Sequence, residues 1–175
     1  MIEKLKINKG FTLIELLMVI AILGSLSSII LVSLGNARSS AALARTKLEF
    51  RSLATAIELY TEDYGGVMPA DVNRGLPPGL ETYLSSGNWP NAPWPGSVYD
   101  WDNWDNPDPG HTGEKIYQIS VRFCPMGGPL SACRFPSDAW ANNFGINSAV
   151  YYCIEGSCRS HVSEPIGYPG YCINC

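Results

Sequence analysis

Six cysteines are the residues whose types and spacing suggest chemistry most directly. All of them lie in the C-terminal third of the chain: Cys124, Cys133, Cys153, Cys158, Cys172 and Cys175. An even number of cysteines in a domain outside the cytoplasm favours disulfides, and we first expect Cys124 to pair with Cys133 across a Pro- and Gly-rich loop. The other four pair locally or cross, which the sequence leaves open. A four-thiolate zinc site made by these four is an alternative, as is a redox role for Cys172 and Cys175, although a redox motif usually lies at a helix start.

A second group of potential ligands is acidic and lies among four of the five tryptophans. Its members are Asp100, Asp102, Asp105 and Asp108. The first two are spaced as in an EF-hand loop, but Trp104 and His111 stand where that loop needs further oxygen ligands. Calcium is therefore a candidate cofactor. The simpler interpretation is a rigid loop whose tryptophans pack on the domain and whose Asp and Asn residues form turns. Exposed tryptophans would instead form a sugar-stacking or protein-contact surface.

The chain shows no recognisable catalytic set. His111 and His161 are isolated in the sequence, and no nucleophile elbow, zinc-protease motif or phosphate-binding loop is present. The sequence therefore argues against an enzyme.

One carboxylate, Glu15, interrupts an otherwise apolar stretch from Phe11 to Leu34. About 20 apolar residues suffice for a helix to cross a bilayer. Lys4, Lys6 and Lys9 precede the stretch, and such a basic flank stays in the cytoplasm, so the rest of the chain should face outward. An ionisable group inside a membrane segment points to a function.

The residues around the start of this stretch resemble a known signature. Lys-Gly-Phe-Thr-Leu-Ile-Glu at residues 9–15, followed by the apolar run, resembles the cleavage and methylation motif of type IV pilins and type II secretion pseudopilins. A secretory signal peptide would instead have a shorter apolar region and a small-residue cleavage site after it.

The resemblance implies roles for three residues. Prepilin peptidase would cut after Gly10, and Phe11 would become the N-methylated first residue. Glu15 would pair with the Phe11 amine of a neighbouring subunit, whereas the alternative is that Glu15 merely reaches the membrane surface. The implied partners are membrane lipid, the inner-membrane assembly platform and further copies of the chain in a filament.

Charge argues against nucleic acid as a partner. The formal net charge is −4, and it would become more negative after removal of a leader that carries three lysines and one glutamate. General nucleic-acid binding requires a basic face.

An extended helix should position the N-terminal motif relative to the rest of the chain. Leu43, Phe50, Ile57 and Tyr64 recur every seven residues, which predicts the apolar face of an amphipathic helix. We therefore expect one helix from Phe11 to about Tyr64, roughly 80 Å long at ~1.5 Å per residue. The Gly-Gly pair and the proline that follow should end it.

The remaining chain should form a small sheet. Residues 116–123 alternate apolar and polar side chains, which predicts a half-buried strand. We expect a second strand at residues 147–154 and a third near residues 159–162. Residues 70–113 should be loop-rich, with one or two helical turns near residues 80–84. A long helix followed by strands predicts an α+β fold with the helix on one face of a small antiparallel sheet.

These expectations define four segments: a leader at 1–10, a transmembrane and assembly segment at 11–35, an amphipathic helix at 36–66, and a globular head at 67–175. The chain would be a single-pass protein of the bacterial cytoplasmic membrane before assembly, and then part of a periplasmic or extracellular filament. We expect a structural filament subunit, either a type II secretion pseudopilin or a type IV pilin. The alternative is a minor or tip pilin that binds a target through its Trp-rich loop.

Overall fold

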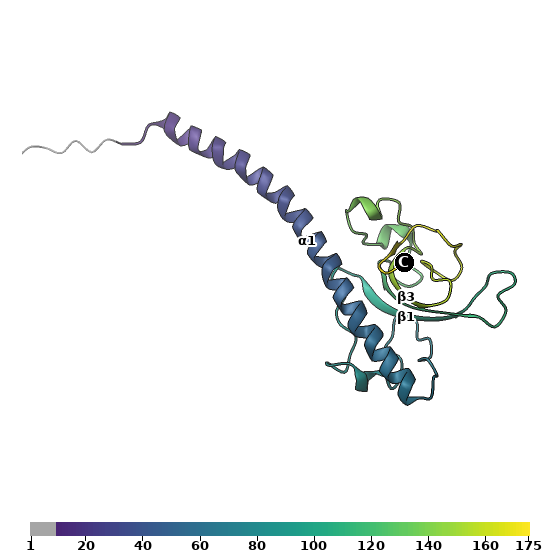
Figure 1. Cartoon of the computed structure of the whole chain (residues 1–175). Coiled ribbons are helices and arrows are strands. Elements are labelled where there is room, and N and C mark those ends of the chain that lie inside the picture. The colour runs from purple at the N-terminus through teal and green to yellow at the C-terminus, as the bar shows by residue number, and fades with distance from the viewer. Residues whose placement is uncertain (1–9) are drawn as a thin grey trace, which may run out of the picture. The chain divides into compact units, whose positions relative to one another are not determined.

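The structure is a computed structural model that describes residues 10–175, without the side chains of residues 29–34 and 36. The chain divides into two compact units, residues 1–38 and residues 39–175. Helix α1 (Leu13–Asp63) begins in the first unit and is the first element of the second (Figure 1). The expected helix is thus found within a residue or two of its predicted ends.

Within residues 39–175, α1 contributes one wall of the hydrophobic core, so from here on we use the name head for this whole unit and not only for residues 67–175. Phe50 and Ile57 of the seven-residue repeat are fully buried, and Leu43 packs against the same core. Tyr64 differs, since it is half exposed and stacks on Tyr60 with ring centroids 4.2 Å apart. The repeat therefore predicts the buried face correctly up to the last turn.

Two glycines end α1 as expected. Gly65 and Gly66 have φ angles of 65° and 90°, the left-handed region that glycine enters without a steric cost. The N–H of Gly66 donates to the carbonyl of Thr61 at 2.8 Å, which satisfies one of the free carbonyl groups at the helix end.

The membrane-spanning first half of the helix is not shown by the structure. Among residues 10–175, no helix combines the length and the apolar character that crossing a membrane requires.

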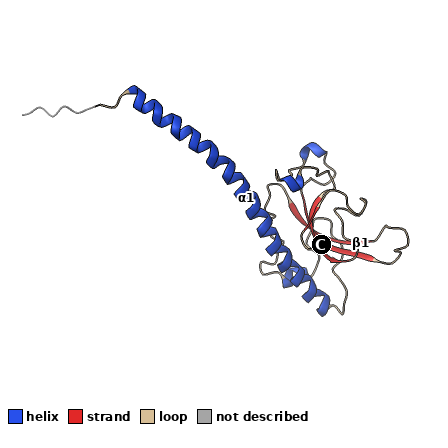
Figure 2. Cartoon of the chain, turned by 45° about the horizontal axis from the view of Figure 1, so that its top comes forward, coloured by secondary structure: helices blue, strands red, loops and turns tan. Residues whose placement is uncertain are grey.

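A four-stranded sheet packs against the part of α1 that belongs to the head. Its strands are β1 (Val98–Asp105), β2 (Lys115–Arg122), β3 (Ala149–Glu155) and β4 (Tyr171–Cys172), and they lie in the order β1-β2-β3-β4. The first three pair antiparallel, and β4 adds a short parallel edge to β3. The loop that joins β1 and β2 projects away from α1 in both views (Figures 1 and 2). The α+β class is confirmed.

The sheet is buried on both faces. Tyr99, Trp101 and Ile119 belong to the core shared with α1, and the hydroxyl of Tyr99 donates to the carboxylate of Glu49 on the helix. The alternating residues Gln118, Ser120 and Arg122 of β2 point to the opposite face and are also buried. The strand predicted there forms, but the prediction that it is half buried is wrong, because Arg159 and Ser160 bond to its polar face.

Two strands differ from the predictions. β1 lies in the segment expected to be loop. Its alternating Asp residues are poor strand formers in general, but they face Arg122 across the sheet, and this pairing stabilises the strand. The strand expected near residues 159–162 does not form, and the edge is taken by β4 instead. The expected helical turns near residue 80 are a 3-10 helix at Leu80–Tyr83. Two further 3-10 turns, Leu130–Ala132 and Ala139–Ala141, lie in the loop-rich connection between β2 and β3 (Figure 2).

Three disulfides close loops in the head. Cys124 pairs with Cys133, Cys153 with Cys158, and Cys172 with Cys175. The prediction of disulfide bonding is confirmed, and each of the last four cysteines pairs locally. The zinc alternative is wrong for this state, because disulfide sulfurs are not the thiolates that zinc requires.

We expect the purified chain to carry no titratable thiol. Alkylation under denaturing, non-reducing conditions should leave its intact mass unchanged, whereas reduction before alkylation should add six adducts, since the sequence has six cysteines. Adducts without reduction, or stoichiometric bound zinc, would contradict the pairing.

Candidate functional site

The N-terminal motif begins the part of the chain that the structure describes. Gly10 and Phe11 are exposed, and a Cβ placed on Gly10 would meet nothing within 4 Å. The lysines of the predicted leader, Lys4, Lys6 and Lys9, lie outside the described residues.

Glu15 caps the first turn of α1. The backbone N–H and the hydroxyl of Thr12 each lie 2.8 Å from its Oε2, and the N–H of Glu15 lies 3.3 Å from the Thr12 hydroxyl. This reciprocal arrangement is a capping box, which satisfies N–H groups that the helix start leaves free. The sequence reasoning missed it, although Thr followed three residues later by Glu is its usual signal.

Apolar side chains cover the surface of the first turns of α1. In this single chain the side chains of Leu13, Ile14, Leu16, Met18, Leu23 and Leu26 are each at least half exposed. Exposed apolar surface of this extent marks a site of contact with lipid or protein.

The four aspartates considered as calcium ligands do not converge. Asp100 and Asp102 face Arg122, whereas Asp105 pairs with Lys115 at 2.7 Å at the exposed end of β1 and β2. Asp108 bonds to Arg159. In residues 10–175 no group of three or more His, Cys, Asp or Glu side chains is placed to hold a metal ion. The structure therefore does not form the calcium site, because the carboxylates neutralise separate basic side chains.

Arg122 is the centre of a buried charge network on the polar face of the sheet. Its Nη2 donates to both carboxylate oxygens of Asp102 at 2.9 Å, its Nε donates to Asp100 at 3.3 Å, and its Nη1 donates to the carbonyl of Ser160. The side chains of these three ionised residues are each less than a tenth exposed. Such a buried group is stable only when its charges are paired and its hydrogen bonds satisfied.

Gln118 connects this network to a second buried arginine. Its Nε2 donates to Asp102 at 3.0 Å and to the carbonyl of Arg159 at 2.8 Å, while its Oε1 accepts from the Arg159 N–H. The Arg159 guanidinium in turn binds Asp108, whose pKa it lowers. These side chains come from residues distant in the sequence and together form one buried polar layer on this face of the sheet.

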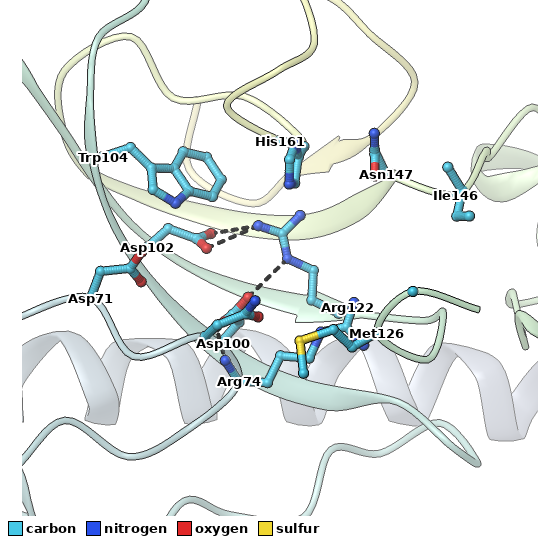
Figure 3. Close-up of a pocket in the computed structure, with 12 residues that line it drawn as sticks. Asp71, Arg74, Asp100, Asp102, Trp104, Arg122, Met126, Ile146, Asn147 and His161 are labelled. Atoms are coloured by element: carbon cyan, nitrogen blue, oxygen red, sulfur yellow. Dashed lines mark hydrogen bonds and ion pairs between the residues drawn. The ribbon is translucent and has the colours of Figure 1, made fainter. Parts of the chain in front are cut away.

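A cavity of about 230 Å³ opens on this polar layer (Figure 3). Arg122, held between Asp100 and Asp102, forms its floor, and Trp104 and His161 lie beside the guanidinium. The Arg122 Cζ lies 5.4 Å from the Trp104 ring centroid, and the Trp104 and His161 rings are 5.6 Å apart. The Trp104 and His161 rings therefore form an aromatic wall of the cavity, next to the Arg122 guanidinium.

Asp71, Arg74 and Asn147 lie around the opening of the cavity. Arg74 has a φ of 57° and is the sole non-glycine residue with positive φ among residues 10–175. Its backbone N–H donates to Asp100 at 2.6 Å, and its guanidinium donates to the carbonyl of Cys124. Unusual backbone conformations held by buried groups occur preferentially at functional sites.

The imidazole of His161 lines this cavity. The Ser163 N–H donates to its Nδ1 at 3.2 Å, and the Ser163 hydroxyl lies 2.7 Å from the same nitrogen. With Nδ1 as the acceptor of both, the neutral ring carries its proton on Nε2. Burial, and then the charge of Arg122, lower the pKa of His161, so the ring is neutral at pH 7.

Burial, and then the Asp102 charge, raise the pKa of Asp100 to about 6. Because this value lies above the ordinary 3.8, the group's contribution to stability is full below pH 3.8 and is lost as the pH rises through about 6. We expect the Asp100 carboxyl carbon to titrate near pH 6 in a ¹³C NMR titration of the folded chain. A midpoint near 4 would contradict this account of its environment.

The Trp-rich loop does not present an exposed aromatic surface. Trp94 and Trp101 are buried, and Trp89 and Trp104 are partly buried. The packing interpretation of the loop therefore holds for these four residues, and Trp104 contributes to the cavity.

Sequence reasoning missed Arg74, Arg122 and Arg159 as members of a site. One signal was present: Asp100 and Asp102 alternate with Tyr99 and Trp101, which is a strand period with acid on one face. The matching partner of this acidic face was Arg122, on the polar face of the second strand.

Comparison with known proteins bears on the N-terminus. The family model described as "Prokaryotic N-terminal methylation motif" matches residues 5–31. No curated protein and no solved structure matches the chain. The chain therefore carries the N-terminal signature of type IV pilins and pseudopilins, which supports a pilin-like subunit processed by prepilin peptidase.

Proposed function

We propose that the chain is a structural subunit of an envelope-spanning filament, either a type IV pilin or a type II secretion pseudopilin. The observation that carries the proposal is the methylation motif, which runs directly into the exposed apolar turns of α1. Lipid would cover these side chains before assembly, and neighbouring helices would cover them in the filament.

Membrane insertion of residues 11–35 is part of this proposal and rests on the sequence. The apolar run with a basic flank favours a single-pass topology with the head outside the cytoplasm. In the filament, Glu15 would pair with the methylated amine of Phe11 in the next subunit. The inner-membrane assembly platform would extract the processed chain from the membrane.

Cleavage after Gly10 can be tested with a pair of glycine variants. Gly10→Val should remain uncut, because a branched side chain obstructs the backbone at the protease site. The chain itself tolerates the added Cβ at Gly10 and at Gly24, since neither would meet another atom within 4 Å. The control Gly24→Val should therefore be cut normally, as measured by the intact mass of the membrane-bound chain. Normal cleavage of Gly10→Val would contradict the assigned site.

A further inference from the structure

The cavity above Arg122 has the composition of a site for a hydrophilic ligand. Most of its lining is charged or polar, with Trp104 as the aromatic exception near the floor and Met126 and Ile146 at the exposed rim. Sites for apolar ligands are instead lined mainly by hydrophobic side chains. The volume, about 230 Å³, suits a single small ring more than a drug-sized molecule.

The charges in the cavity nearly balance, which disfavours a highly charged ligand. Arg122 is paired with both Asp100 and Asp102, which leaves one negative charge when both carboxylates are ionised. Asp71 and Arg74 add one carboxylate and one guanidinium at the opening.

The groups at the opening are planar. A carboxylate accepts two hydrogen bonds side by side, and a guanidinium has five N–H donors, of which Arg74 uses one from Nη1 on the Cys124 carbonyl. Neighbouring hydroxyl groups on a sugar ring match such pairs, because each hydroxyl both donates and accepts. The Nε2–H of His161 adds a further donor.

Trp104 provides the surface that the apolar face of a sugar ring requires. Aromatic rings offer a large apolar area with little conformational freedom to lose. The Arg122 guanidinium lies over this ring at 5.4 Å and the His161 ring lies 5.6 Å from it, so the position of the Trp104 ring is set before any ligand arrives, which lowers the cost of binding.

We propose that this cavity binds a neutral monosaccharide unit, with Asp71, Arg74 and His161 bonding its hydroxyl groups and Trp104 packing against its ring. The site is in the head, so it is independent of the proposed role of the N-terminal helix in assembly.

The test uses the purified full-length chain in a polyoxyethylene detergent, because alkyl glycosides would compete. The probes are glucose, galactose, mannose and N-acetylglucosamine, and binding is measured by saturation-transfer NMR with titration. At least one sugar should bind with a dissociation constant in the millimolar range. Asp71→Asn should weaken that binding about tenfold, because a charged acceptor is lost. The control Glu81→Gln, at an exposed residue of the Leu80–Tyr83 turn away from the cavity, should bind like the wild type.

Both variants should retain the unfolding midpoint of the wild type, so a loss of binding reports on the site and not on the fold. The proposal is overturned if none of these sugars binds. It is also overturned if Asp71→Asn binds as tightly as the wild type, or if free glycine binds while the sugars do not, which would indicate a site for a zwitterion.

Discussion

Replacing Glu15 by Leu should abolish filament assembly while leaving the amount of processed chain in the membrane normal. Removing a charge from an apolar segment makes insertion no worse. The incoming subunit would lose the partner of its charged N-terminus, and a buried charge left unpaired costs about 3–5 kcal/mol. Electron microscopy of sheared filaments and immunoblotting of the membrane fraction measure the two quantities.

The capping box gives Glu15 a second role, helix capping, beside the proposed ion pair with the next subunit. One variant separates the two roles. Gln serves as well as Glu in a capping box, so Glu15→Gln should keep the bonds to Thr12 while losing the charge. If the charge drives assembly, Glu15→Gln should lose filaments as Glu15→Leu does. Wild-type filament yield from Glu15→Gln would show that the cap, and not the ion pair, explains the residue.

Replacing Arg122 by Met should destabilise the head by about 3–5 kcal/mol, since it leaves two buried carboxylates without their cation. The change should appear as a lower midpoint of urea unfolding. Tryptophan fluorescence reports on the head alone even in the full chain, because Trp89 is the first tryptophan in the sequence.

The matched control removes an exposed ion pair from the same strand. Lys115 pairs with Asp105 where both side chains are substantially exposed, and such pairs contribute about 0–1 kcal/mol. Lys115→Met should therefore leave the midpoint nearly unchanged. Equal midpoints for Arg122→Met and the wild type would show that the buried network does not stabilise the head.

The helix was predictable because its signals are local. The seven-residue repeat of Leu43, Phe50 and Ile57 and the Gly-Gly end are each contained in a short window, and both are found in the structure. The methylation motif is equally local, and the family match confirms it.

β1 and the polar cavity were not predictable in the same way. Asp100 and Asp102 favour turns when considered alone, and they form a strand because Arg122 lies opposite them. The partner layer at Arg159 and Ser160 comes from a distant loop that forms no strand. The calcium hypothesis failed for the same reason, since the acidic spacing was visible in the sequence and the basic partners were not.

Mass spectrometry of the mature N-terminus tests the filament-subunit account most directly. The chain isolated from membranes or sheared filaments should begin at Phe11, with a methyl group on its α-amine, because the resemblance of residues 9–15 to the cleavage and methylation motif implies a cut after Gly10. A chain that still begins at Met1, or that begins beyond Leu34, would contradict the account.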